Sequence, residues 1–157
     1  MTSPIIQITT NLIYPDAGIP INHQAEDILF CLCCYSESRG EPDEGQKAVA
    51  SVILNRFNAR KIYFGLTIRD VILRHNCSEV YQFSGMNPRE NNYGKLIKPE
   101  MLDWVRIVKN CLPVYLQGVL REYKDLYYFC KEGWQNTCLF DSLKYVRSIG
   151  NHRFYSE

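Results

Sequence analysis

Apolar positions recur with a helical period along much of this chain. From residue 22 to residue 38 they form two stripes on opposite faces of one predicted helix, with Asn22 as its N-cap. The first stripe is Ala25, Ile28, Leu29, Leu32 and Tyr35, and the second is Phe30, Cys33 and Cys34. A helix that is apolar all round is buried, so this segment predicts the central helix of the fold.

Three further helices are predicted downstream. Residues 41–44 (Glu-Pro-Asp-Glu) indicate a helix start, with proline at the first helical position and acidic residues in the first turn. Residues 67–70 (Thr-Ile-Arg-Asp) form a capping box that opens a short helix through Leu73. Pro99 opens a fourth helix, which Pro113 is expected to kink or end.

The other segments are extended or irregular. Residues 1–21 predict an extended arm, and residues 76–97 a long ordered loop of the kind that is usually functional in a compact domain. Residues 126–129 predict a short strand, and residues 149–152 a turn. We therefore expect a mainly α fold with a small β element (α+β), in which residues 22–157 form a single domain after the arm.

Composition narrows the class of protein. A length of 157 residues suits one domain, and a net charge of +1 removes the bulk electrostatic argument for a nucleic-acid partner. No apolar run approaches the ~18 residues that span a bilayer, and residues 1–4 lack the basic stretch and apolar core of a signal peptide. We expect a monomer made in a reducing cytoplasm without a signal peptide, with no stable membrane insertion.

The seven cysteines leave at least one thiol unpaired. No Cys-x-x-Cys occurs, and the three histidines form no zinc pattern with the cysteines, so we expect no metal and no cofactor. Reduced cysteines that act as small core residues are the favoured interpretation, and a disulfide framework is the alternative.

Glu37 is the candidate for chemistry that the pattern itself selects. It follows Phe30 by seven residues and so closes the second apolar stripe in the last turn of the predicted central helix. Apolar surroundings raise the pKa of a carboxyl group, which suits a general acid. The alternative is a glutamate that pairs with Arg39 or Arg56 to satisfy a helix end.

Several motifs occur in an order that resembles one enzyme family. They are residues 35–41 (Tyr-Ser-Glu-Ser-Arg-Gly-Glu), 45–46 (Gly-Gln), 48–56 (Ala-Val-Ala-Ser-Val-Ile-Leu-Asn-Arg), 71–72 (Val-Ile), 82–84 (Gln-Phe-Ser), 127–128 (Tyr-Tyr) and 149–155 (Ile-Gly-Asn-His-Arg-Phe-Tyr). Each piece alone is weak, but the ordered set resembles the SleB-type cell-wall hydrolases, which include spore-cortex-lytic enzymes.

The resemblance implies a lysozyme-like fold of the lytic-transglycosylase kind that cleaves the bond between N-acetylmuramic acid and N-acetylglucosamine. The family's catalytic glutamate is the first of its Glu-Ala-Arg-Gly-Glu element, which falls on Glu37, with Ser38 in place of the usual alanine. Glu41, the second glutamate of that element, is expected instead to cap the next helix and hold the turn.

One glutamate suffices if the reaction needs no activated water. No second acid is evident, since Asp103, Asp125 and Asp141 look like surface or turn residues. In a lytic transglycosylase the same glutamate protonates the leaving oxygen and then takes a proton from the muramic acid 6-hydroxyl, which closes a 1,6-anhydro ring. Lysozyme-type hydrolysis, which commonly uses two carboxylates, is the near alternative.

Other residues are expected to bind substrate or support the site. Gln82 and Ser84 could hydrogen-bond sugar hydroxyls, or could bond only within their loop. Tyr128 is favoured over its neighbour Tyr127 to face the cleft. The pair Asn55–Arg56 either orients Glu37 or complements the helix dipole. His152 is most simply a hydrogen-bonded structural residue of its turn.

The setting that these features suggest is a phage endolysin, released onto peptidoglycan glycan strands with the help of a holin. A non-catalytic wall-binding protein of the same fold is a second hypothesis, against which an intact Glu37 argues. A thiol-dependent enzyme that uses Cys33 or Cys34 is a third, but neither cysteine has a histidine near it in sequence.

Overall fold

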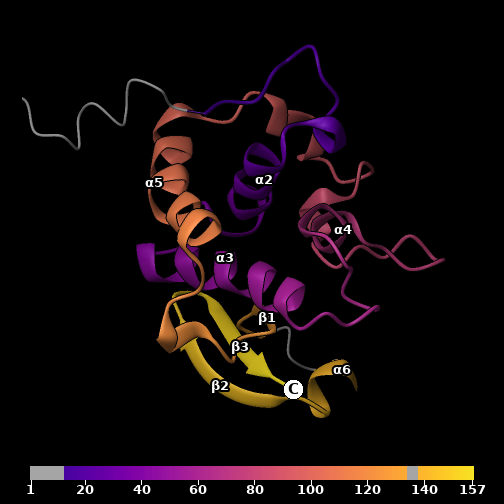
Figure 1. Cartoon of the computed structure of the whole chain (residues 1–157), viewed down its shortest axis with the longest axis vertical. Helices are drawn as coiled ribbons and strands as arrows, with labels where there is room; N and C mark the ends of the chain where they lie inside the picture. Colours follow the sequence, from indigo (N-terminus) through magenta and orange to yellow (C-terminus); the bar gives the residue numbers. More distant parts are fainter. Residues whose placement is uncertain (1–12, 134–137) are drawn as a thin grey trace, which may run out of the picture.

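The computed structural model describes residues 13–133 and 138–157 and shows helices around a central one, with a small sheet at one end (Figure 1). The helices are α2 (Glu26–Ser38), α3 (Asp43–Asn58), α4 (Ile68–Leu73), α5 (Met101–Gln117) and α6 (Cys138–Asp141). Short 3-10 turns are η2 (Ile21–His23), η3 (Ser84–Met86), η4 (Tyr93–Ile97) and η5 (Arg121–Tyr123). The strands are β1 (Tyr128–Lys131), β2 (Lys144–Ile149) and β3 (His152–Ser156). The expectation of a mainly α fold with a small β element is confirmed.

The central helix is α2, as its two apolar stripes predict. Residues 29–35 are all buried, and α2 packs against α3, α4 and α5. The predicted start of the helix at Asn22 is wrong. Residues 21–23 form the separate turn η2, and the buried Gln24 amide then bonds to backbone atoms of Asp16 and Ile19, so that α2 begins only at Glu26.

The predicted arm falls partly outside the described residues, because residues 1–12 are not among them. Residues 13–20 contain no helix or strand, and they dock on α5: the indole nitrogen of Trp104 donates to the carbonyl of Ile13 at 2.8 Å. This stretch is thus packed against the domain.

Helices α4 and α5 bear on two predictions, the capping box at Thr67 and the effect of Pro113. The side chain of Thr67 accepts from the backbone N–H of Asp70 at 3.0 Å, so the cap predicted for α4 is confirmed. Pro113 does not end α5, which continues to Gln117 and stops at Gly118, where φ is +100°. A proline within one turn of a helix end removes one backbone hydrogen bond, and here the helix continues without it.

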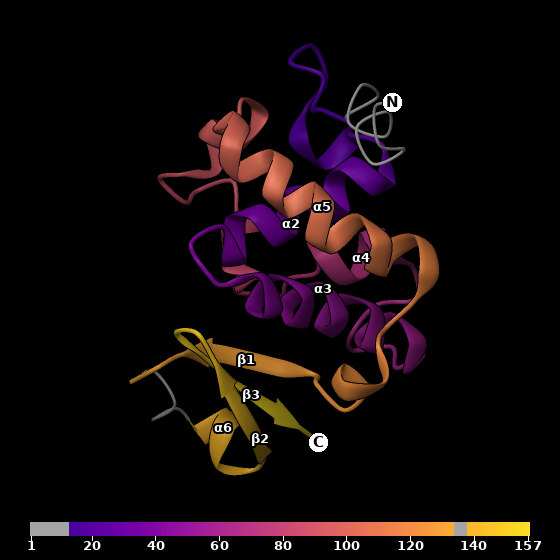
Figure 2. The same ribbon diagram turned by 90° about the vertical axis from the view of Figure 1, so that its left-hand side faces the viewer.

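The three strands form an antiparallel sheet in the order β1-β3-β2, on the side of α3 away from α2 (Figures 1 and 2). The predicted strand at residues 126–129 is shifted, and β1 occupies residues 128–131. Leu126 is fully buried and its carbonyl accepts from Asn55 Nδ2 at 2.9 Å, which holds it outside the sheet ladder. The turn at Gly150–Asn151 joins β2 to β3 as predicted, whereas no feature of the sequence analysis indicated β2.

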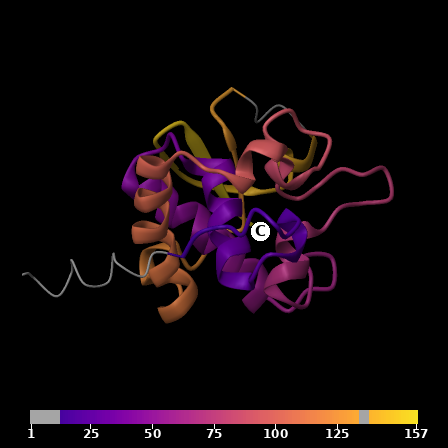
Figure 3. The ribbon, with the colours of Figure 1, turned by 90° about the horizontal axis from the view of Figure 1, so that it is seen from above.

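The long connection at residues 76–97 lies on the side of the molecule opposite α5 (Figure 3). An isolated antiparallel bridge between His75 and Tyr81 closes its first part, and η3 and η4 lie near its centre and end. Its turn η3 packs against α2. The connection therefore reaches the end of the central helix at which Glu37 lies.

Candidate active site

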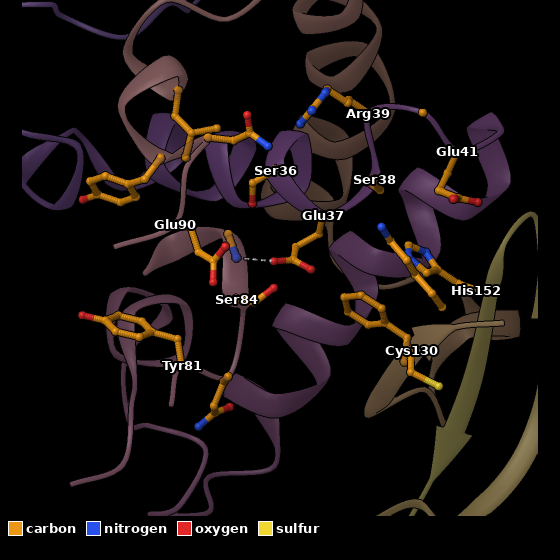
Figure 4. A pocket seen from close by; sticks show the side chains of 18 of the residues that line it. Ser36, Glu37, Ser38, Arg39, Glu41, Tyr81, Ser84, Glu90, Cys130 and His152 are labelled. Carbon is orange, nitrogen blue, oxygen red and sulfur yellow. Dashed lines mark hydrogen bonds between the residues drawn. The ribbon is translucent and has the colours of Figure 1, made fainter. Parts of the chain in front are cut away.

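A cavity of about 650 Å³ opens where α2, the connection at residues 76–97, and strands β1 and β3 meet (Figure 4). Its wall includes residues 36–41 at the end of α2 and the start of the turn that follows. Residues 129–131 of β1 and His152 of β3 face it from the sheet. The size is within the range of small-molecule ligand sites.

Glu37 lies in the last turn of α2 and lines this cavity. Its Oε1 atom accepts a hydrogen bond from the backbone N–H of Gly85 at 3.0 Å, drawn as a dashed line in Figure 4. Burial raises the pKa of Glu37, because an enclosed carboxyl group disfavours the charged form. The Gly85 N–H and the positive charges of Arg56 and Lys131 act in the opposite direction, and Glu90 adds to the rise.

Gly85 can approach Glu37 only because it has no side chain. A Cβ atom at this position would lie 2.5 Å from Ser36 Oγ and 2.6 Å from Ser36 Cβ. These separations are shorter than van der Waals contact. Glycine at position 85 thus lets the connection close on α2 and deliver its N–H to the carboxyl group.

Arg56 is a buried cation in the wall of the cavity. Its Nε donates to the carbonyl of Tyr127 at 2.7 Å and its Nη1 to Gln82 Oε1 at 2.9 Å. Aromatic rings surround the guanidinium, and burial lowers the pKa of Arg56 to about 10, so it stays charged at neutral pH. Its charge favours the ionised form of Glu37. No hydrogen bond joins the two side chains within the described residues.

Four of the predicted supporting residues line the cavity with Glu37. They are Arg56, Gln82, Ser84 and His152. Besides accepting from Arg56, the amide of Gln82 donates to the carbonyl of Tyr63 at 2.8 Å. These bonds link the connection to α3 and to residue 63, so Gln82 does not bond only within its loop, which was the alternative considered for it. Ser84 is exposed, and Figure 4 shows its hydroxyl directed into the cavity.

The other two predicted residues are not part of the cavity wall. Asn55 is buried, and its Nδ2 donates to the carbonyls of Tyr123 at 2.7 Å and Leu126 at 2.9 Å. The ring of Tyr128 lies 5.0 Å from the Arg56 guanidinium, and its hydroxyl donates to Glu157 at 3.2 Å. Asn55 therefore connects α3 to the chain before β1, and Tyr128 packs around Arg56.

His152 is 2% exposed and its Nδ1 atom has no hydrogen-bond partner in the part of the chain that the structure describes. Burial lowers the pKa of His152, opposed by the nearby Glu41 carboxyl and assisted by the charge of Lys131. A neutral imidazole at neutral pH follows. The expectation of a hydrogen-bonded structural histidine is not met at Nδ1.

Glu41 does not cap α3, contrary to expectation. The N-cap residue is Pro42, without a side-chain cap bond, and the Glu41 carboxylate instead accepts from the backbone N–H of Asn151 at 2.8 Å and from its Nδ2 at 3.4 Å. A Cβ atom on Gly150, where φ is +59°, would lie 2.1 Å from Glu41 Oε2. Glu41 thus holds a turn, but it is the turn between β2 and β3.

Residues that no sequence pattern singled out also line the cavity. Glu90 adds a carboxylate to those of Glu37 and Glu41, and Tyr81 and Tyr93 add aromatic side chains from the connection. The only signal for them was the prediction that residues 76–97 form a functional loop. A loop has no hydrophobic periodicity from which the direction of a side chain could be predicted. The sequence therefore does not distinguish Glu90 from the other acidic residues of the chain as a cavity residue.

The cysteines give no second candidate chemistry. The six cysteines whose side chains the structure describes are free, and Cys31, Cys33, Cys34 and Cys111 are buried, whereas Cys77 is exposed. Burial raises the pKa of the Cys33 and Cys34 thiols well above the usual value, which disfavours a thiolate nucleophile. Cys138 has no described side chain.

Within the described residues, no group of three or more His, Cys, Asp or Glu side chains is arranged to hold a metal ion. No helix in residues 13–133 or 138–157 has the length and hydropathy needed to cross a membrane.

The sequence model of the cell wall hydrolase family matches residues 40–155, which include the cavity residues of the connection and of the sheet. The chain belongs to the cell wall hydrolase family. This confirms the resemblance found in the sequence. The family match begins three residues after Glu37, so the role of this residue rests on its geometry.

Two curated proteins share a short segment with this family member. The spore cortex-lytic enzyme of Oceanobacillus iheyensis is 50% identical over 46 residues, which cover 29% of this chain and 17% of that protein. The spore cortex-lytic enzyme of Bacillus subtilis is 50% identical over 44 residues, 27% of this chain and 14% of that protein. The matched segments thus span about a sixth of those proteins. No solved structure gives a significant match.

Proposed function

We propose that this chain degrades peptidoglycan by cleaving the glycosidic bond between N-acetylmuramic acid and N-acetylglucosamine, with Glu37 as the general acid. Membership of the cell wall hydrolase family and the cortex-lytic relatives support the substrate class. The observation that carries the proposal is the position of Glu37: an enclosed carboxyl group of raised pKa that lines a cavity of about 650 Å³.

The hydrogen bond from Gly85 assigns different tasks to the two oxygens of Glu37. Oε1 accepts the N–H, so Oε2 is the oxygen left to carry the transferable proton. Once that proton passes to the glycosidic oxygen, Glu37 becomes negatively charged. The Gly85 N–H and the charges of Arg56 and Lys131 then stabilise the carboxylate.

For the second half of the reaction we propose the route of a lytic transglycosylase. The ionised Glu37 takes the proton of the muramic acid 6-hydroxyl, and the 6-oxygen bonds to the anomeric carbon. The product has a 1,6-anhydro end, no water is consumed, and Glu37 returns to its protonated state. One carboxyl group thus serves as acid and then as base.

Lysozyme-type hydrolysis is the second candidate, and Glu90 is the observation that favours it. A second carboxylate on the same cavity wall is what hydrolases commonly use beside the general acid. A non-catalytic wall-binding protein of the same fold is less well supported, because a pure binder gains nothing from a carboxyl group that is enclosed at a cost in free energy.

Sugar rings would be held by the other side chains of the wall. We propose that the rings of Tyr81 and Tyr93 pack against sugar faces and that the Ser84 hydroxyl bonds a sugar hydroxyl or acetamide. All three belong to the connection at residues 76–97 and line the cavity. Substrate binding would therefore depend on the same segment that delivers Gly85 to Glu37.

Digestion of purified peptidoglycan, followed by mass spectrometry of the released muropeptides, tests the proposal. We expect fragments with 1,6-anhydro-muramic acid ends. Fragments with reducing muramic acid ends would support hydrolysis instead. Release of neither would overturn glycan cleavage at this bond.

A further inference from the structure

Glu90 is a carboxylate of the cavity wall with no ion-pair partner in residues 13–133 or 138–157. Its position is fixed by two backbone bonds, since its N–H donates to the carbonyl of Asn87 and its carbonyl accepts from the N–H of Tyr93, both at 3.0 Å. The neighbouring Arg89 forms its ion pair with Glu79. The charge of Glu90 is thus left facing the cavity.

Three glutamates line the cavity, and Glu41 is bound to Asn151, which leaves Glu37 and Glu90 in contrasting environments. Glu37 is enclosed at the end of the central helix, whereas Glu90 is exposed to water on the connection. Figure 4 shows the two carboxyl groups directed toward the same space, with Ser84 close by. In such a pair, the enclosed carboxyl group suits a general acid and the other suits electrostatic stabilisation.

We propose that Glu90 is the second carboxylate of the reaction, whose negative charge stabilises the positive charge that develops on the muramic acid ring as the glycosidic bond breaks. The inference rests on the proposed function of Glu37. In the bond-breaking step the proton of Glu37 passes to the leaving oxygen, and the electron pair of the C–O bond goes to that oxygen. The ring becomes oxocarbenium-like. Glu90 forms no bond and transfers no proton.

This role is independent of the group that attacks the ring afterwards. The stabilised cation can be captured by the 6-hydroxyl or by water, because Glu90 acts before either attack. Because this role is electrostatic, Glu90 can affect the chemical step from the connection without a hydrogen bond to Glu37.

The test compares Glu90→Gln with Glu90→Asp and with the control Glu122→Gln on purified peptidoglycan. Glu122 is exposed on η5 and does not line the cavity, so its substitution makes the same change in net charge elsewhere. We expect Glu90→Gln to lower kcat by about 10- to 100-fold with little change in KM. This is less than the 10²–10³-fold typical of a stabilising donor in a water-excluded site, because Glu90 is exposed. Glu90→Asp keeps the charge and should retain most of the rate.

The pH profile gives a readout that a structural role would not change. Burial raises the pKa of Glu37 and the charge of Glu90 raises it further, so removal of that charge makes Glu37 lose its proton more easily. The upper limb of the rate profile should therefore move to lower pH in Glu90→Gln and stay in place in Glu122→Gln.

Three results would overturn the role of Glu90: an unchanged kcat, a rise in KM alone, or a change in the ratio of anhydro to reducing ends at an unchanged total rate. The last would make Glu90 a base for water. Each of these can occur while Glu37→Gln is inactive, which leaves the proposed function intact. An active Glu37→Gln, by contrast, would contradict the proposed function itself.

Discussion

The carboxyl group of Glu37 experiences opposing influences from its surroundings. Enclosure favours its neutral form, while the Gly85 N–H and the charges of Arg56 and Lys131 favour its ionised form. Burial prevails and the pKa is raised. Such a balance suits a group that must hold a proton in the resting enzyme and carry a charge once the proton has been donated.

The raised pKa predicts how Glu37→Gln changes stability with pH. The folded state binds the Glu37 proton more tightly than the unfolded state, so the native protein loses stability as the pH rises from the ordinary pKa of glutamate through the raised one. Glutamine has no such loss. The melting temperature of Glu37→Gln relative to the native protein should therefore rise between acidic and neutral pH, as thermal unfolding followed by circular dichroism would measure. If the melting temperature of Glu37→Gln relative to the native protein fell over this pH range, the pKa of Glu37 would be lowered in the folded state and burial would not be the dominant influence on it.

The substitution Gly85→Ala should push the connection away from α2 at the point where Gly85 approaches Ser36. The added methyl would overlap Ser36, so residues near Gly85 must move, at a cost of about 1–3 kcal/mol in the free energy of unfolding. The N–H bond to Glu37 would lengthen and the rate of peptidoglycan cleavage should fall.

Gly94→Ala is the matched control, because Gly94 lies on η4 of the same connection and a Cβ there meets nothing within 4 Å. Urea unfolding and initial rates should show a loss in Gly85→Ala only. If Gly94→Ala lost as much stability and activity as Gly85→Ala, the close approach of Gly85 to Ser36 would not be the cause of the loss.

Glu37 could be predicted at the residue scale and Glu90 could not. Glu37 continues a stripe with helical spacing from Phe30, and spacing is visible in a sequence. Glu90 lies in a connection without periodicity, and its place on the cavity wall depends on how that connection folds against α2. Asn55 follows buried positions on a helix, and periodicity predicts its burial. The carbonyls that it binds belong to Tyr123 and Leu126, which are 68 and 71 positions further along the chain, and no local pattern indicates them.

At the scale of elements, Asn55 joins α3 to the chain that leads into β1. Its amide donates to the backbone carbonyls of Tyr123 and Leu126; the Tyr123 carbonyl also accepts from the N–H of Leu126 at 3.2 Å, whereas Asn55 is the one donor to the Leu126 carbonyl within the described residues. Asn55→Ala should therefore lower the free energy of unfolding by about 1–3 kcal/mol, because the buried Leu126 carbonyl loses its partner. The rate per folded molecule should change little, since Asn55 does not line the cavity.

Asn58→Ala is the control for this prediction, on the exposed end of the same helix. Denaturant titration should show near-native stability for Asn58→Ala. An Asn55→Ala variant that is stable but inactive would instead support the role of orienting Glu37 that the sequence offered for the pair Asn55–Arg56.

The turn between β2 and β3 shows what local sequence can and cannot predict about elements. Gly150 and Asn151 indicate the turn by residue type alone. Its anchor is Glu41, which is 110 residues away and accepts the Asn151 N–H. Residue spacing does not reveal a pairing over such a distance, and therefore predicts only that Glu41 caps the helix that follows it.

At the scale of the whole molecule, the cysteines test the core. Four buried thiols lie in α2 and α5, whereas Cys77 is exposed and Cys130 half-buried. A reducing agent should leave the melting temperature unchanged. Iodoacetamide under native conditions should label Cys77 first and the buried thiols last, as peptide mass spectrometry would reveal. A drop of many degrees on reduction would instead indicate disulfides, each worth about 2–5 kcal/mol.

The architecture follows from the sequence where hydrophobic periodicity is strong. Patterns in contiguous residues predict the central helix, its neighbouring helices and the long ordered loop at residues 76–97. The sheet order and the cavity depend on contacts between distant segments, because the end of α2 meets residues 81–96, β1 and β3 only in the folded chain. A monomer that acts on glycan strands after holin-dependent release stays a prediction.

The central claim is that Glu37 carries out the proton transfers, and rates of peptidoglycan cleavage by Glu37→Gln and Glu41→Gln test it most directly. Both carboxyl groups line the cavity, and both substitutions keep the side-chain shape. General acid–base catalysis contributes roughly 10²–10⁴-fold, and Glu37→Gln should lose at least the upper part of that range because one group serves both steps. Glu41→Gln should lower stability by ~1 kcal/mol through its bonds to Asn151 and keep most of the rate per folded molecule. Substantial activity in folded Glu37→Gln, together with an inactive Glu41→Gln, would contradict the account.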